Sequence, residues 1–289
     1  MNRYARTTKA KSVAVRPIGR PVSNFDFIEE QFGIGASMTL PRLMSQVRHH
    51  RGKTMVVEEL VLSTDLSEEL EDLKTIFDKP FEYHVYRLSF FTKRFKRKAS
   101  IESATDRDFI GYAIVVNRID NPTGKNQSNS VHVYESVIKK SCHAHNFVRG
   151  EQEWICSING CRFKIRGYLY AEQNMVTNVC AHATLRTVSA RFVPGGLSYR
   201  QISKLAGVSL NNAADGLSSD QIVKVLEAAG ARCIVADFVK RKSPPAPFHK
   251  YIYGSIESGY PAIVFFGTAT SSTSYHVIPV FGHTFNQDT

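Results

Sequence analysis

Apolar residues in the first part of the chain recur at helical spacing in two places. One stripe, of Leu40, Leu43 and Val47, follows Thr39, and a second runs from Asp65 to Pro80. Spacings of three and four residues place side chains on one face of a helix. Threonine and aspartate are good helix caps and proline stops a helix, so the sequence predicts two short amphipathic helices.

From residue 80 to residue 170 the pattern becomes that of β-strands. Runs rich in valine, isoleucine, tyrosine and phenylalanine are separated by short polar stretches, and Asn159-Gly160 between the last two favours a tight hairpin turn. The sequence therefore predicts an antiparallel sheet after a helical lead-in. The expected strands are 82–91, 109–119, 131–138, 154–158 and 161–170.

After Tyr170 helices come before strands. A helix is expected from Cys180, with others at 198–207 and 251–257, and Ser218 with Gln221 forms a capping box for a helix that ends at Gly230. The expected strands are 231–238, 261–267 and 275–283. Helices and strands in both halves predict an α+β protein.

The composition is that of a globular protein. The chain has 289 residues, of which 43% are hydrophobic and 22% charged, which argues against wholesale disorder and a disulfide-dense miniprotein. No apolar run is long enough to span a bilayer, and no export signal is recognisable. The expected location is therefore cytoplasmic, with the five cysteines reduced rather than paired.

The formal net charge of +11 is concentrated early in the chain. Residues 1–24 hold six basic residues and no acid, which predicts a flexible basic tail, and Lys93–Lys98 packs five cations around Phe95. One interpretation is contact with nucleic acid or another anionic partner. The other is a solvated tail and loop, since no recognition motif accompanies the charge.

One cysteine stands where a nucleophile would be placed. Cys180 falls in the first turn of its expected helix, where the macrodipole and free N–H groups stabilise a thiolate. Such a cysteine needs a histidine to move the proton, and His276 lies near the start of a late strand. Gln173 precedes the helix, where its amide can join the Cys180 N–H as an oxyanion donor.

The segments that carry this arrangement are Gln173 followed by Cys180-Ala181-His182-Ala183, the helices SYRQISKLAG and GLSSDQIVKVLEAAG, then GYPAIVFF and HVIPVFGH. Over about residues 162–289 the chain resembles the papain-like cysteine peptidases, and most closely the compact bacterial branch that processes double-glycine leader peptides, with its stand-alone relatives.

The resemblance implies a papain-like fold in the C-terminal half, with Cys180 as nucleophile, His276 as base and Gln173 as oxyanion donor. The family has an Asp or Asn soon after the histidine. Here Asp288 and Asn286 are the residues available, both farther along, and either could orient the imidazole. We expect the chain to be a fragment, because it ends directly after them.

Other interpretations of the histidines and cysteines remain open. His182 falls on a different helix face from Cys180 and is expected to be structural, and Cys233 is expected to be a core residue. Cys142-His143-Ala144-His145 with Cys156 and Cys161 suggests zinc, although the spacing is a poor template for four ligands. We therefore expect no metal, and the chemistry needs no cofactor.

The expected organisation is a basic tail at 1–24, an α+β region at 25–161 and a papain-like domain at 162–289. The expected function is hydrolysis of a peptide or amide through an acyl-enzyme, with a peptide or protein as substrate. The alternative is a papain-like module without activity, whose basic N-terminal region binds nucleic acid or another anionic partner. The sequence predicts no oligomeric state.

Overall fold

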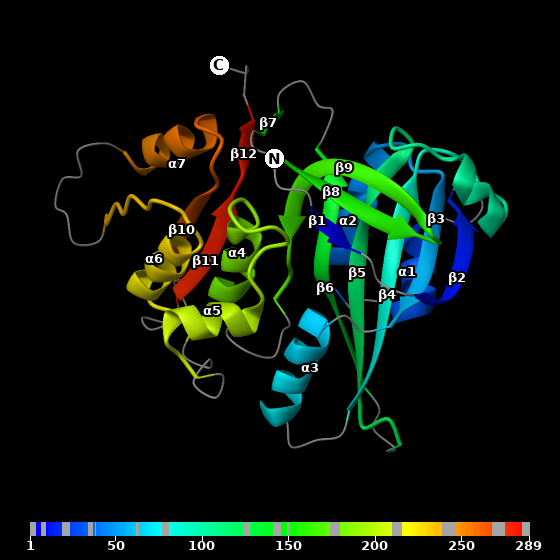
Figure 1. Cartoon of the computed structure of the whole chain (residues 1–289), viewed down its shortest axis with the longest axis horizontal. Coiled ribbons are helices and arrows are strands. Elements are labelled where there is room, and N and C mark those ends of the chain that lie inside the picture. The colour runs from blue at the N-terminus through cyan, green and yellow to red at the C-terminus, as the bar shows by residue number, and fades with distance from the viewer. Residues whose placement is uncertain are drawn as a thin grey trace. The chain divides into compact units, whose positions relative to one another are not determined.

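The structure, a computed structural model, describes residues 4–6, 10–18, 24–33, 37, 39–61, 64–76, 81–123, 128–140, 146–148, 151–173, 180–209, 216–238, 247–267 and 275–284. The chain forms two compact units (Figure 1). The first comprises Met1–Ser141 and Gln152–Val176, and the second Cys142–Glu151 and Thr177–Thr289. Both contain helices and strands, so the expected α+β class is confirmed.

An eight-stranded curled sheet dominates the first unit, in the order β1-β8-β9-β6-β5-β4-β3-β2. Neighbouring strands are antiparallel except for β1 and β8, which pair in parallel. All five expected strands are present. The bounds are β1 Tyr4–Arg6, β2 Ala10–Pro17, β3 Thr54–Leu60, β4 Phe81–Phe91, β5 Phe109–Asp120, β6 Ser128–Lys139, β8 Gln152–Ile158 and β9 Cys161–Tyr170.

Two helices pack on one face of this sheet. They are α1 (Asn24–Phe32) and α2 (Thr39–His49), and their apolar side chains share a core with inward residues of β3, β4, β5 and β6. The helix predicted after Asp65 is α3 (Thr64–Ile76), and a short 3-10 helix, η1 (Lys98–Ser103), precedes β5. Helix α2 begins at Thr39 as expected, but the oxygen that caps it belongs to Ser37, which accepts hydrogen bonds from the backbone N–H groups of Thr39 and Leu40.

A tight turn and a close approach in the sheet depend on particular residues. Asn159 (φ 48°) and Gly160 (φ 83°) adopt the left-handed conformation of the hairpin that the sequence predicts between β8 and β9. Gly111 on β5 (φ 149°) lies against β6, where a Cβ would come within 2.2 Å of the carbonyl oxygen of Val137.

Replacing Gly111 by alanine is expected to lower the free energy of unfolding by about 1–3 kcal/mol, because the added methyl group forces β5 away from β6. Chemical denaturation of both proteins measures the difference. Gly160→Ala serves as a control for backbone strain without a clash, since a Cβ at residue 160 would meet no atom of the described residues within 4 Å. If Gly111→Ala lowers the free energy of unfolding by no more than Gly160→Ala does, β5 and β6 do not approach each other this closely.

Two boundaries differ from those expected. Residues 10–17, assigned to a flexible tail, form the edge strand β2, which pairs along its length with β3. The domain boundary expected at residue 162 falls inside the β8–β9 hairpin, where β9 pairs with both β8 and β6. The first unit instead extends to Val176.

The second unit combines helices with short strands. Helices α4, α5 and α6 share one hydrophobic core with Val277 of β11, and β10 pairs with β11. A separate pair joins β12 to β7, a strand that the chain forms before β8. The bounds are α4 Cys180–Ser189, α5 Tyr199–Ala206, α6 Ser219–Ala228, α7 Phe248–Glu257, β7 Asn146–Val148, β10 Ala262–Gly267, β11 Tyr275–Val280 and β12 Gly282–Thr284.

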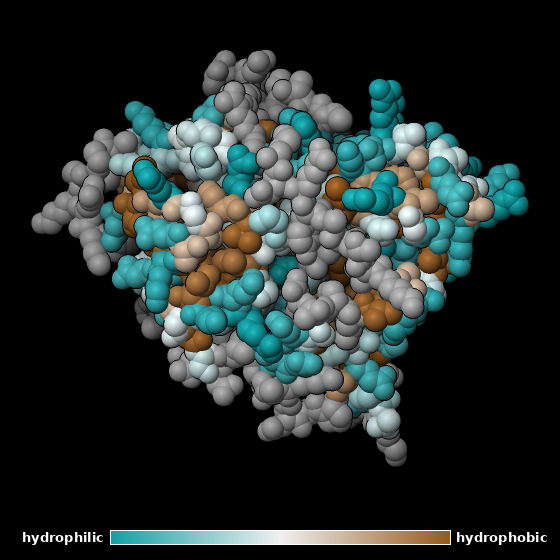
Figure 2. Space-filling model, viewed as in Figure 1, coloured by the Kyte–Doolittle hydropathy of each residue, from teal (hydrophilic) through white to brown (hydrophobic). Residues whose placement is uncertain are grey.

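The strand predicted at 231–238 is absent. The segment follows α6 without pairing to any described strand, and Ile234 is 89% exposed. Its valine and isoleucine are typical of a strand, but a strand also needs a partner, and none of the described strands pairs with this segment. Other large apolar side chains of this unit are exposed as well, and Figure 2 shows hydrophobic residues at the surface over its elements.

In the described part of the chain, no helix combines the length and apolar character needed to cross a membrane.

Candidate functional site

Helix α4 begins at Cys180 and is otherwise buried. Every residue from Ala181 to Ser189 is buried, whereas Cys180 is partly exposed at the margin of the core. Cys180 is therefore the one position on α4 from which a side chain reaches solvent.

Helix α4 is joined to the strand that carries His276. Thr184 lies one turn after Cys180, and its buried hydroxyl donates a hydrogen bond of 3.0 Å to the carbonyl oxygen of Val277. The side chain of Val277 is 3% exposed and packs in the core that α4 shares with α5 and α6. The cysteine helix and the histidine strand are thus neighbours within one unit.

Replacing Thr184 by valine is expected to lower the free energy of unfolding by about 1–3 kcal/mol, because the buried carbonyl of Val277 loses its donor. Thermal or urea denaturation measures the loss. Thr187→Val is the matched control, since Thr187 is buried on the same helix and makes no side-chain hydrogen bond within the described residues. Equal effects of the two substitutions would mean that the Thr184 hydrogen bond contributes nothing.

His276 lies on β11 opposite Phe266 of β10. The two rings meet edge to face, with centroids 5.7 Å apart and an angle of 84° between their planes. His276 is partly buried and Phe266 is 39% exposed. Because side chains alternate along a strand, the imidazole leaves β11 on the face opposite the buried Val277 side chain. His276 is therefore not enclosed in the core, and it is directed towards the face that carries Phe266.

Gln173 lies in the first unit, just after β9. The residue before it, Glu172, accepts hydrogen bonds from the Thr39 hydroxyl at 2.6 Å and from the Val133 N–H at 2.7 Å, which fixes the backbone there. Burial raises the pKa of Glu172 above its ordinary value. Gln173 is partly buried, and residues 174–179 lie outside the described chain. Its role as oxyanion donor to Cys180 stays a prediction.

The residues expected to orient the imidazole, Asn286 and Asp288, lie outside the described residues, as does the Cys142–His145 segment considered as a zinc site. Within the described ranges, no cluster of three or more His, Cys, Asp or Glu side chains has the arrangement of a metal site. Cys156 is fully buried in the sheet of the first unit.

His182 is a structural residue of the α4 core. It is buried, its Nε2 lies 3.1 Å from the Ser203 hydroxyl, and its ring packs against Tyr199. Burial lowers the pKa of His182 to about 4, so the ring is neutral at physiological pH. The structural interpretation made from the sequence therefore holds.

Two other cysteines are accessible but poorly suited to act as nucleophiles. Burial raises the pKa of the Cys161 thiol, and Glu102 raises it further. Burial and Glu227 both raise the pKa of Cys233, which is partly exposed at the edge of the second core rather than within it as expected. Both thiols are therefore protonated at neutral pH, which makes them internal references for the reactivity of Cys180.

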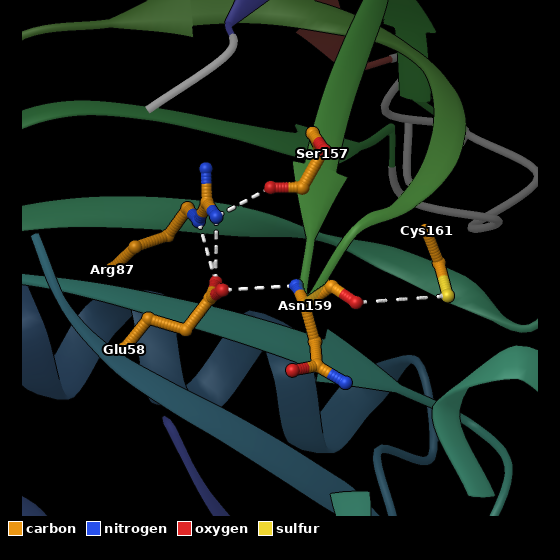
Figure 3. Close-up of polar contacts among 5 residues, drawn as sticks. All are labelled: Glu58, Arg87, Ser157, Asn159 and Cys161. Carbon is orange, nitrogen blue, oxygen red and sulfur yellow. Dashed lines mark hydrogen bonds and ion pairs between the residues drawn. The ribbon is translucent and has the colours of Figure 1, made fainter. Parts of the chain in front are cut away.

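A buried ion pair in the first unit was not anticipated from the sequence. The Glu58 carboxylate on β3 lies 2.7 Å from Nη2 of Arg87 on β4, and both side chains are 1% exposed (Figure 3). Arg87 also donates to the carbonyl oxygen of Ser157, and the Asn159 N–H donates to Glu58 at 3.0 Å. The pair thus joins β3 and β4 to the β8–β9 hairpin. In the sequence, the only sign of this ion pair is the two consecutive acids Glu58 and Glu59.

Comparison of the chain with protein-family models, with curated proteins and with solved structures finds no match to any of the three.

Proposed function

We propose that the second unit is a papain-like cysteine hydrolase that cleaves a peptide or related amide through an acyl-enzyme. Cys180 is the nucleophile and His276 the general base and acid. The main support is the position of Cys180, which is the one partly exposed residue on an otherwise buried helix and stands at its N-terminus. The hydrogen bond from Thr184 to the carbonyl oxygen of Val277 adds that α4 and the strand of His276 are neighbouring elements.

In the proposed reaction, His276 takes the thiol proton and the Cys180 Sγ attacks the carbonyl carbon. The tetrahedral intermediate carries its charge on the former carbonyl oxygen, which the Cys180 N–H stabilises. His276 then returns the proton to the leaving amine as the C–N bond breaks. A water molecule, deprotonated by His276, hydrolyses the thioester and releases the acid, with the thiol restored.

The exposed aromatic ring beside His276 favours a substrate with apolar groups. Phe266 lies on the same face of the β10–β11 hairpin as the imidazole and contacts it, with ring centroids 5.7 Å apart. The Phe266 side chain is 39% exposed. Exposed rings at a site gain free energy when an apolar side chain covers them, so we propose that apolar substrate residues bind here.

The test is hydrolysis of a library of fluorogenic peptide amides, with mass spectrometry of the quenched protein to find the acyl adduct. We expect turnover of a subset enriched in apolar residues and an adduct on the tryptic peptide that contains Cys180. Cys233→Ala is the control, because Cys233 is a partly exposed cysteine of the same unit with a raised thiol pKa. Turnover that survives in Cys180→Ala would contradict the proposal, as would the absence of turnover by the wild-type protein.

A further inference from the structure

One end of the first unit carries exposed cations from several segments of the chain. The loop after β4 contributes Arg94, Lys96 and Arg97, and η1 begins with Lys98; all four are exposed. Within the described residues none of these four forms an ion pair. The sequence predicts a basic cluster at Lys93–Lys98, and the structure shows which residues anchor it and which other cations lie beside it.

This loop is anchored rather than free. Phe95, at its centre, is 1% exposed and packs edge to face on Phe91, with ring centroids 5.2 Å apart. The Thr54 hydroxyl donates to the carbonyl oxygen of Lys93 at 2.8 Å and accepts from the Phe95 N–H at 2.9 Å. The cations around Phe95 are therefore held on a fixed backbone.

Strand β9 adds a second row of cations. Arg162, Lys164 and Arg166 alternate with buried residues, so all three project from the outer face of the strand. The two rows are connected through the segment after η1, where Asp106 accepts a hydrogen bond of 2.9 Å from the Lys164 N–H. Phe163 of β9 also packs on Phe91, the ring that holds Phe95.

The neighbouring segments extend this surface. The ammonium group of Lys139, at the end of β6, donates to the carbonyl oxygens of Asp106 and Arg107 at 3.2 and 3.0 Å. His50 of the α2–β3 turn contacts the carbonyl oxygen of Lys139 at 3.0 Å, which brings the exposed Arg51 to the same end. We name this surface the basic end. It comprises Arg51, Arg94, Lys96, Arg97, Lys98, Arg107, Lys139, Arg162, Lys164 and Arg166.

We propose that the basic end binds the phosphate backbone of a double-stranded nucleic acid without sequence preference. Cations held on fixed elements release the counterions of a duplex on binding. A membrane surface is less suitable, because interfacial binding also inserts apolar groups. None of the large exposed apolar residues of the described chain belongs to the basic end, and Phe95 is buried. The absence of exposed aromatic rings among these described residues also argues against stacking of single-stranded bases.

The experiment measures fluorescence anisotropy of a labelled DNA duplex of random sequence, roughly 20 base pairs long, with the full chain and increasing salt. A variant reverses four exposed charges of the basic end: Lys96→Glu, Arg97→Glu, Arg162→Glu and Lys164→Glu. The matched control reverses four exposed cations of the second unit: Lys204→Glu, Lys224→Glu, Arg232→Glu and Lys250→Glu.

We expect the basic-end variant to bind at least about tenfold more weakly at low salt, with a slope of log affinity against log salt that is smaller by about four. The control should stay within about twofold of wild type. Equal losses in both variants, or no duplex binding by the wild-type chain, would overturn the proposal. So would tighter binding to phosphatidylserine vesicles than to the duplex. The Cys180→Ala variant should bind the duplex with the affinity and salt dependence of the wild type. Failure of this proposal is therefore distinguishable from failure of the proposed hydrolase.

Discussion

Replacing Arg87 by methionine is expected to lower the free energy of unfolding by about 3–5 kcal/mol. The substitution keeps an unbranched side chain of similar length but leaves the buried Glu58 carboxylate without its cation, and that carboxylate lies at 1% exposure. The carbonyl of Ser157 loses its donor at the same time. Denaturation in urea, followed by circular dichroism, measures the difference from wild type.

The double variant Arg87→Met with Glu58→Leu separates the ion pair from the packing around it. Removing both charges avoids the isolated carboxylate, so the double variant is expected to recover much of the stability that Arg87→Met loses. Lys11→Met is the control for loss of a pair at the surface, because Lys11 lies 3.5 Å from Glu59 and neither partner is buried. An Arg87→Met variant no less stable than Lys11→Met would show that the buried pair is misplaced.

Replacing His276 by alanine is expected to reduce peptide-amide hydrolysis by about 10²–10⁴-fold, because a general base contributes acceleration of that size. The loss should appear in kcat rather than in KM, since His276 acts on the proton of the reacting thiol and of the leaving group. Steady-state kinetics on a substrate identified in the peptide library measure it.

The double variant Cys180→Ala with His276→Ala should be no slower than Cys180→Ala alone, because groups that act as a unit lose their whole contribution when either is removed. Phe266→Leu is the control for packing, since Phe266 contacts the imidazole without taking part in proton transfer. If Phe266→Leu loses as much activity as His276→Ala, the ring acts through substrate binding or packing and not through the proton.

Local patterns predicted most of the elements because neighbouring residues determine them. Asn159-Gly160 predicted its hairpin, the capping box of Ser218 with Gln221 placed the start of α6, and a helix was expected from Ser198, which caps α5. Strand β3 escaped prediction because two adjacent acids, Glu58 and Glu59, interrupt its apolar pattern. Glu58 is buried only because Arg87 lies opposite it, and that partner is 29 residues away in the sequence.

The candidate site was predictable only in part, because some of its contacts join residues that are far apart in the sequence. The apolar spacing after Cys180 placed the cysteine at a helix start, where α4 begins. The hydrogen bond from Thr184 to Val277 joins residues 93 positions apart, and no local pattern contains it. The pairing of β11 with β10 also decides which face of the hairpin His276 projects from. The alternation of residues along β11 alone does not predict that face.

The central claim is that His276 activates the Cys180 thiol, and competitive alkylation of the native protein tests it most directly. At about pH 6, limiting iodoacetamide followed by peptide mass spectrometry compares Cys180 with Cys161 and Cys233, whose thiol pKa values are raised by burial. In the wild-type protein Cys180 should react at least about tenfold faster than either reference, and in His276→Ala that preference should disappear. Equal labelling of the three cysteines in the wild type, or a preference for Cys180 that survives in His276→Ala, would contradict the claim.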